Sequence, residues 1–164
     1  MMNQLYLLII AIFTFSAVSA QTDGLPLYEQ FPDVPPFSII RVPDSTVFQK
    51  SNLAKKKPTL IILFSPDCEH CQHETQMLKA EMNLLHDVQI VMISFMDYNL
   101  VKKFYDEYGI AATPNITMGR DEKFFLGSFY KMQTYPSLYL YNKKGKFVQK
   151  FEGNVAVKKI ADAF

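Results

Sequence analysis

Apolar residues along the chain gather in short continuous runs that alternate with helix-spaced stripes. Residues 59–64 and 88–95 are near-continuous apolar runs, which is the pattern of strands buried on both faces of a parallel sheet. Four apolar residues between these runs can share one face of a helix: Met77, Leu78, Met82 and Leu85. The pattern predicts a helix from Glu69 to about His86 that joins two parallel strands in a β-α-β unit.

A second amphipathic helix is expected after this unit. Five residues mark its apolar side: Leu100, Val101, Phe104, Tyr105 and Tyr108. Asp97 or Asn99 can cap the start of this helix, and Gly109 can end it. Residues 110–123 contain Pro114 and Gly119 and follow no period, so an irregular segment is predicted there.

The last third of the chain is predicted to form a short helix, a hairpin and a terminal helix. Aromatic residues crowd 124–130, which suggests a short helix or turn packed on the core. Residues 137–141 and 146–151 have strand-like patterns, and the short loop between them is typical of antiparallel pairs. The terminal helix carries a stripe at helical spacing: Val157, Ile160, Ala161 and Phe164.

The N-terminal part of the chain divides into three segments. Residues 1–20 hold an apolar stretch followed by small residues, which predicts a signal peptide cleaved after Ala20; left uncleaved, it would anchor the chain in a membrane. Residues 21–36 are rich in proline and are expected to form an extended lead-in. Residues 37–42 can form a first edge strand that a proline ends. The mature chain, residues 21–164, is the size of one domain.

Composition and net charge limit the kinds of function that the chain can have. The hydrophobic content of 49% is ample for a core without disulfide staples, and the formal net charge of +1 gives no field that would attract nucleic acid. Export places the protein outside the cytosol, in the periplasm or another extracytoplasmic space if the source is bacterial, where disulfides persist. We expect a soluble monomer that needs no cofactor.

The chain has two cysteines, Cys68 and Cys71, and they flank Glu69-His70 directly after the first predicted strand. They therefore lie where a central strand ends and a helix begins. There the unpaired N–H groups and the positive end of the helix dipole stabilise a thiolate, which is the reactive form of cysteine. This arrangement favours dithiol–disulfide redox chemistry.

Two other roles for these cysteines are open. A structural disulfide that closes so small a loop would remove little chain entropy from the unfolded state. A structural zinc site needs four ligands, and only three histidines could complete it: His70, His73 and His86. Because His70 lies inside the motif and His73 on the first helical turn, they make no convincing second ligand pair. No metal is expected.

A β-α-β half with Cys-x-x-Cys at its first helix, followed by a β-β-α half, resembles the thioredoxin fold. The resemblance covers residues 37–164 and implies an α/β domain with a mixed central sheet flanked by helices. Its second marker is the segment Thr134-Tyr135-Pro136-Ser137, directly before the penultimate strand. Thioredoxin-like proteins carry a cis-proline that faces the dithiol at the position of Pro136, and X–Pro bonds adopt the cis form at low cost.

Within this superfamily the chain is similar to the exported TlpA/ResA-like thiol-disulfide oxidoreductases. Glu74, three residues beyond Cys71, matches a glutamate that is common in this group after its Cys-x-x-Cys. Three positions depart from the familiar patterns. Asp67 replaces the usual tryptophan, Ile62 stands where thioredoxins bury an acidic residue, and Tyr135 is bulkier than the Thr or Val often found there. The substrate group therefore does not follow from the resemblance.

Each residue of the predicted site has an expected role. Cys68 attacks a substrate disulfide and Cys71 resolves the mixed disulfide, so the pair cycles between a dithiol and a Cys68–Cys71 disulfide. His70, when protonated, stabilises the Cys68 thiolate. Glu74 either accepts the proton of Cys71 or is an ordinary solvent-facing helix residue. Three residues would form or border the floor on which an extended substrate backbone lies: Thr134, Tyr135 and Pro136.

Three functions from different classes fit these residues. The first is a thiol-disulfide oxidoreductase that reduces or exchanges disulfides of exported proteins, working with a membrane-linked electron donor or acceptor. The second is a net disulfide oxidase or isomerase, although the stretch from Gly109 to Thr134 is too short for the helical domain that DsbA-like proteins insert. The third is a thioredoxin-fold binding module with little redox turnover.

Overall fold

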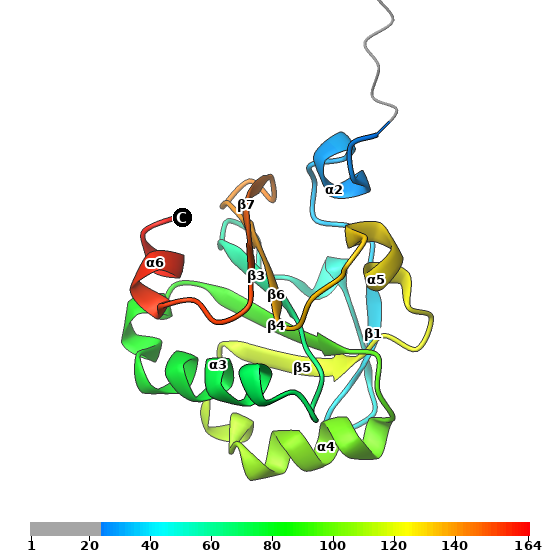
Figure 1. Cartoon of the computed structure of the whole chain (residues 1–164), viewed down its shortest axis with the longest axis vertical. Helices are drawn as coiled ribbons and strands as arrows, with labels where there is room; N and C mark the ends of the chain where they lie inside the picture. Colours follow the sequence, from blue (N-terminus) through cyan, green and yellow to red (C-terminus); the bar gives the residue numbers. More distant parts are fainter. Residues whose placement is uncertain (1–23) are drawn as a thin grey trace, which may run out of the picture.

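The structure is a computed structural model that describes residues 24–164, so the predicted signal peptide, residues 1–20, lies outside the described part of the chain. One mixed sheet forms its centre, with these strands: β1 (Ser38–Arg41), β2 (Val47–Gln49), β3 (Thr59–Leu63), β4 (Gln89–Ser94), β5 (Ile116–Arg120), β6 (Ser137–Tyr141) and β7 (Phe147–Glu152). Their order across the sheet is β2-β1-β5-β4-β3-β6-β7 (Figure 1).

Helices cover both faces of this sheet (Figure 1). One face carries α2 (Leu27–Gln30) and α5 (Phe125–Tyr130), and the other carries α3 (Glu69–Ala80), α4 (Tyr98–Glu107) and α6 (Val157–Ala161). Three 3-10 turns join these elements: η1 (Lys50–Asn52), η2 (Met82–Leu85) and η3 (Ile110–Ala112). The predicted arrangement of a mixed sheet flanked by helices is confirmed.

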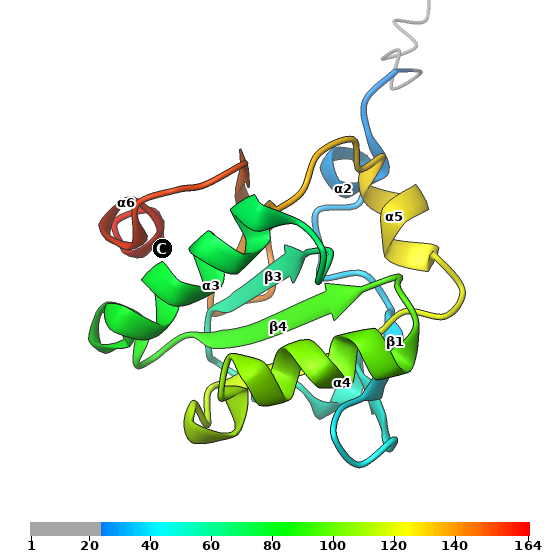
Figure 2. The ribbon, with the colours of Figure 1, turned by 60° about the horizontal axis from the view of Figure 1, so that its bottom comes forward.

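β3 is the central strand that the apolar run predicted. Leu60 and Ile62 point into the core under α3 and α4, whereas Ile61 and Leu63 point into the core under α2 and α5. All four side chains are at most 1% exposed, because a strand alternates its side chains between two covered faces. β3 pairs in parallel with β4 and antiparallel with β6. Figure 2 shows α3 and α4 running alongside β3 and β4.

The ends of the two long helices agree only partly with the prediction. α3 ends at Ala80, and the residues that follow form the turn η2 instead of a continued helix. Leu85 in that turn is nevertheless fully buried, so the apolar spacing predicted its burial but not its conformation. α4 begins as predicted, because the Asp97 side chain accepts a hydrogen bond from the Asn99 N–H at 2.8 Å. Gly109, with φ +57°, follows the end of α4.

Residues 110–123, predicted to be irregular, contain η3 and strand β5. β5 pairs in parallel with β4 and antiparallel with β1. Gly119 is not a strand breaker here. A Cβ at this position would lie 2.6 Å from the Ile40 carbonyl oxygen and 2.9 Å from Ile39 Cδ1, so the glycine allows β1 to approach β5 closely.

We expect Gly119→Ala to destabilise the fold by about 1–3 kcal/mol, because the added methyl group would push β1 away from β5. Equilibrium unfolding in denaturant measures the change in the free energy of unfolding. Thr117→Ala is the control, since Thr117 lies on the same strand but is partly exposed; it should cost less than about 1 kcal/mol. Equal losses for the two variants would contradict the close approach at Gly119.

β1 lies second from the edge of the sheet, although an edge position was predicted. After β1 the chain turns back, and Asp44 accepts hydrogen bonds from the Thr46 N–H and hydroxyl group at 3.1 and 2.8 Å. The residues that follow pair antiparallel with β1 and form the edge strand β2. A short side-chain-stabilised turn of this kind has no apolar period of its own, which is why the prediction missed it.

Both ends of the described chain differ from their predictions. The lead-in is not extended throughout, because residues 27–30 form α2 and both Tyr28 and Val34 are buried. The ring of Tyr28 packs against three aromatic rings: Tyr130, Tyr139 and Phe147. At the C-terminal end, α6 stops at Ala161. Phe164 is 37% exposed, so the predicted buried stripe ends before it.

The remaining predicted elements are confirmed. The hairpin is formed by β6 and β7, which pair antiparallel. The short helix expected in the aromatic segment is α5, and its Gly127 has a packing reason: a Cβ there would lie 2.5 Å from the ring of Phe124. Sheet and helices together bring the end of β3, the start of α3 and the start of β6 to one end of the domain.

Candidate functional site

The two cysteines lie at the first turn of α3. Cys68 is the N-cap residue, and its carbonyl oxygen accepts a hydrogen bond from the Gln72 N–H at 3.0 Å. The Cys68 thiol is partly exposed, whereas Cys71 is only 1% exposed. Both are free thiols. The outer cysteine can therefore meet a substrate, while the inner cysteine is shielded from solvent.

The turn before β6 lies against Cys68. Leu63, the last residue of β3, pairs with Ser137, the first residue of β6, so the residues before Ser137 meet the loop that follows β3. The peptide bond between Tyr135 and Pro136 is cis. The Tyr135 carbonyl oxygen is 3.9 Å from Cys68 Sγ. Sheet pairing thus brings together two motifs that are far apart in the sequence.

Thr134 and Tyr135 belong to this turn. Thr134 is exposed, and its carbonyl oxygen accepts a hydrogen bond from the Ser137 hydroxyl group at 2.6 Å. Tyr135 is half-buried. This burial raises the pKa of Tyr135, and the charges of Cys71 and Cys68 add to the rise. The residues predicted to form or border the substrate floor therefore belong to a turn that lies beside the dithiol.

Glu74 is buried one turn beyond Cys71, so of the two alternatives for this residue an ordinary solvent-facing position is wrong. Glu74 is only 1% exposed to solvent. Its Oε2 accepts hydrogen bonds from the Val155 N–H at 2.9 Å and from Asn154 Nδ2 at 3.3 Å, while Oε1 has no partner among the described residues. Burial raises the pKa of Glu74, and the two hydrogen bonds and nearby His73 oppose the rise. Such a carboxylate is well suited to accept a proton.

Cys71 is a buried thiol whose ionisation its surroundings disfavour. Burial raises the pKa of the Cys71 thiol far above its ordinary value; a hydrogen bond with the Ser65 backbone opposes this, and Cys68 and Glu74 add to the rise. Residues three apart on a helix are neighbours on one face, as Cys71 and Glu74 are. Glu74 is therefore a candidate to receive the Cys71 proton.

The central strand supplies no acid to this site. Ile62 is 1% exposed and belongs to the same apolar cluster as Cys71. The buried carboxylate near the inner cysteine comes from α3, through Glu74, and not from β3. The absence of an acidic residue at position 62 thus leaves the dithiol with a different candidate base.

Asn154, which the sequence analysis missed, connects His70 to Glu74. His70 Nδ1 is 2.9 Å from Asn154 Oδ1, and Asn154 Nδ2 donates to the His70 carbonyl oxygen at 2.6 Å. The sequence Gly153-Asn154 after a strand signals a turn, but nothing in it links that turn to α3. His70 itself is exposed, as are three other polar residues around the motif: Asp67, Glu69 and His73.

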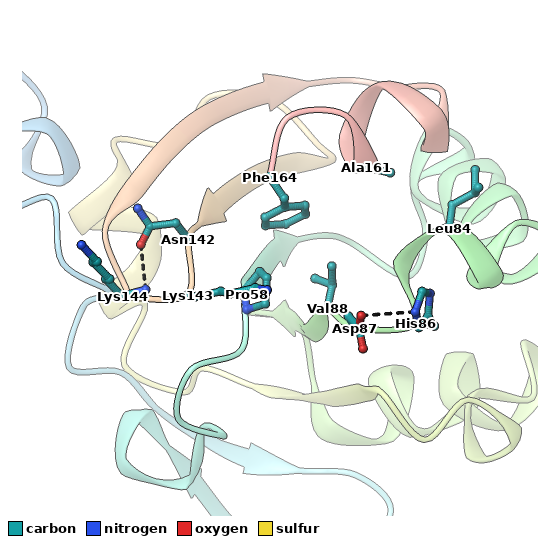
Figure 3. Close-up of a pocket in the computed structure, with 10 residues that line it drawn as sticks. All are labelled: Pro58, Leu84, His86, Asp87, Val88, Asn142, Lys143, Lys144, Ala161 and Phe164. Carbon is teal, nitrogen blue, oxygen red and sulfur yellow. Dashed lines mark hydrogen bonds and ion pairs between the residues drawn. The ribbon is translucent and has the colours of Figure 1, made fainter.

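A surface cavity of about 590 Å³ lies at the other end of the sheet (Figure 3). Pro58 precedes β3 and Val88 precedes β4, so the cavity is at the start of these parallel strands. Cys68 follows the end of β3. The cavity, which Figure 3 shows bordered by Leu84, Ala161 and Phe164, is therefore no part of the dithiol site.

Residues 24–164 were compared with the requirements of a membrane-spanning helix and of a metal site. None of their helices combines the length and the apolar character needed to cross a membrane. In the same residues, no three His, Cys, Asp or Glu side chains are grouped as ligands of a metal ion would be.

A dithiol at the end of a central parallel strand, with a cis-proline turn beside it, defines a thioredoxin-like domain. The model of the thioredoxin-like domain family matches residues 49–164, and the chain belongs to that family. The match includes Cys68, Cys71 and Pro136. The fold class and the thioredoxin resemblance predicted from the sequence are confirmed.

Solved structures share this fold at low sequence identity. A secreted Mycobacterium tuberculosis disulfide oxidoreductase homologous to Escherichia coli DsbE has a TM-score of 0.65 at 17% identity, covering 78% of this chain and 93% of its own. StoA from Bacillus subtilis has a TM-score of 0.57 at 19% identity, with 80% and 98% covered. The thioredoxin domain of a Bacteroides vulgatus thiol-disulfide oxidoreductase has a TM-score of 0.63 at 17% identity, with 79% and 93% covered. No curated protein sequence matches the chain.

Proposed function

We propose that the protein is an exported thiol-disulfide oxidoreductase that reduces or exchanges disulfides of exported proteins. The observation that carries the proposal is a partly exposed Cys68 at the N-terminus of α3, paired with a buried Cys71 one turn along. A helix end stabilises the thiolate that starts exchange, and a shielded second thiol can complete it.

Reduction of a substrate takes two exchange steps. The Cys68 thiolate attacks one sulfur of the substrate disulfide, which forms a mixed disulfide and releases the other substrate sulfur as a thiolate. Cys71 then gives its proton to Glu74 and attacks Cys68 Sγ, which releases the second substrate thiolate. The substrate gains two electrons, and the cysteine pair loses them as the Cys68–Cys71 disulfide forms. A dithiol donor must return these electrons.

The cis-proline turn offers a place for the substrate chain. An extended substrate backbone would lie on Tyr135 and Pro136, with Thr134 at its border. The Tyr135 carbonyl oxygen, 3.9 Å from Cys68 Sγ, marks the side from which a substrate disulfide would approach. Main-chain contacts of this kind are independent of the substrate sequence, which suits an enzyme that acts on several proteins.

The charges around Cys68 support the reducing direction. Asp67 and Glu69 are exposed neighbours of Cys68 and place negative charge beside its thiolate. Destabilising the thiolate disfavours the reduced form and lowers the reduction potential, whereas protonated His70 acts in the opposite sense. The expected potential lies between those of thioredoxin and the disulfide isomerases, at about −180 to −270 mV.

The exported location rests on residues 1–20, which lie outside the described part of the chain. The similar M. tuberculosis protein is a secreted one, which supports export. The proposed partners are exported proteins that carry disulfides or dithiols, together with a membrane-linked electron donor or acceptor. The chain is proposed to act as a monomer, soluble if cleaved near Ala20 and anchored if not.

Reduction of insulin by dithiothreitol tests this function. The purified protein is expected to accelerate the precipitation of the insulin B chain, because the dithiol transfers electrons from dithiothreitol to the insulin disulfides. A folded protein that leaves the rate unchanged would instead be a thioredoxin-fold binding module, and the proposed function would be wrong.

Replacing His70 by proline is expected to lower the reduction potential, by about 20 mV for each 1 kcal/mol of thiolate stabilisation lost. Proline is tolerated in the first turn of a helix, so α3 should persist. Equilibration with glutathione measures the potential, and His86→Ala, a change of an exposed histidine at the other end of the sheet, should leave it unchanged. An unchanged or raised potential in His70→Pro would mean that the imidazole faces away from Cys68.

A further inference from the structure

Asn154 lies in a loop that touches two parts of the dithiol site. The loop follows β7, and Asn154 is 84 residues beyond His70 in the sequence. Gly153, with φ +71°, turns the chain at this point, and its N–H donates to the Pro136 carbonyl oxygen at 2.9 Å. Val155 donates its N–H to Glu74 at 2.9 Å. The loop thus contacts the cis-proline turn and the start of α3 together.

The hydrogen bonds of Asn154 determine which way its amide faces. Nδ2 is 2.6 Å from the His70 carbonyl oxygen and 3.3 Å from Glu74 Oε2, and both of these atoms are acceptors. An NH2 group at this position satisfies both, whereas an amide oxygen would face two acceptors. Oδ1 therefore faces His70 Nδ1, at 2.9 Å, and Nδ1 carries a proton.

Asn154 also supplies one of the two hydrogen bonds that Glu74 accepts. Hydrogen bonds to a carboxylate favour its ionised form, and burial opposes that form. The other titratable groups that act on this carboxylate or respond to it are Cys71, on the same helix face, and the exposed His73. The bond from Val155 comes from the backbone, so the bond from Asn154 is the one that a substitution can remove.

We propose that Asn154 is a positioning residue of the dithiol site, which keeps the Glu74 carboxylate ionised as the base for Cys71 and holds the His70 imidazole in one orientation. The inference rests on the proposed function, because a base for Cys71 matters only if Cys71 resolves a mixed disulfide. If the inference is correct, attack by Cys71 depends on Asn154, although Asn154 forms no hydrogen bond with the sulfur of either cysteine among the described residues.

A coloured aromatic disulfide separates the two exchange steps. Reduced protein is mixed with an equimolar amount of a nitrobenzoate disulfide, and absorbance records each thiolate as it leaves. Attack by Cys68 releases the first thiolate, and resolution by Cys71 releases the second, with the Cys68–Cys71 disulfide as the protein product. The rates of both releases are measured across a range of pH.

In Asn154→Ala, the second release is expected to slow by about tenfold at neutral pH, because a hydrogen bond to a charged group is lost. The first release should stay within about twofold, since an exposed histidine has a modest influence on Cys68. The second release should also need a higher pH to reach half its maximum rate. Asn154→Asp should be slower still, because it replaces a donor by a negative charge beside Glu74.

A double-mutant cycle with Glu74→Gln identifies the route of the effect. If Asn154 acts through the carboxylate, adding Asn154→Ala to Glu74→Gln should change the second release by less than about twofold. Equal slowing by Asn154→Ala with and without Glu74, or no slowing at all, would overturn the inference. A wild-type protein that releases no second thiolate would overturn the proposed function itself.

Discussion

A Cys68→Ala variant is expected to reduce no disulfide, and insulin reduction should fall to the rate that dithiothreitol gives alone. The reason is the position of Cys68, whose partly exposed thiol at the N-cap of α3 is the one that a substrate can reach. Without this thiol the first bond to the substrate cannot form, and buried Cys71 cannot replace it. The loss should be complete and not partial.

The matched variant Cys71→Ala should behave differently. Cys68 can still attack, but no internal thiol remains to break the mixed disulfide, so substrate proteins should accumulate on Cys68. Non-reducing gels and mass spectrometry after mixing with oxidised substrate detect this species. A mixed disulfide in Cys68→Ala, with none in Cys71→Ala, would reverse the proposed roles of the two cysteines.

The second large effect is expected for Glu74→Gln, which should slow the resolving step by about 10²-fold, the usual contribution of a general base. The glutamine keeps an oxygen that can accept the Val155 N–H, but it cannot take a proton from Cys71. The coloured aromatic disulfide measures this as slow release of the second thiolate. Glu81→Gln, at the exposed C-cap of the same helix, is the control and should leave that release unchanged.

Glu74→Gln should also change how stability depends on pH. Burial raises the pKa of Glu74 in the folded protein above its ordinary value of 4.5. At pH values between 4.5 and the raised pKa of the folded protein, Glu74 holds a proton in the folded state that it has released in the unfolded state. The free energy of unfolding therefore falls as pH rises through this interval. A glutamine has no such proton, and the variant should not show this fall. A variant that lost stability by the same amount at all pH values would show that Glu74 is a packing residue and not a buried acid.

Strong local patterns explain which parts of the fold were predictable. The run Leu60 to Leu63 could be assigned to a central strand because every residue in it is apolar and both faces of β3 are covered. β5 could not be assigned in the same way, because Gly119 breaks the apolar pattern for a reason that lies on another strand. The close backbone of β1 at Ile40 explains it, and no local pattern records that approach.

In the candidate site, too, some residues could be predicted from local motifs and others could not. Cys68, Cys71 and Pro136 could be named because each belongs to a motif with a fixed place in the thioredoxin fold. The burial of Glu74 could not, since a first-turn acid on a helix is favourable both in solvent and under a loop. Asn154 was missed because its partners lie about 80 residues away and meet it only after β7 has joined the sheet.

The reduction potential of the cysteine pair tests the central claim most directly. The protein is equilibrated with glutathione buffers of graded potential, and the fraction of Cys68–Cys71 disulfide is measured by thiol alkylation and mass spectrometry. We predict a single two-electron transition at about −180 to −270 mV, with each disulfide inside one molecule. Cysteines that stay reduced in oxidised glutathione, or that form only disulfides between molecules, would contradict a thiol-disulfide oxidoreductase.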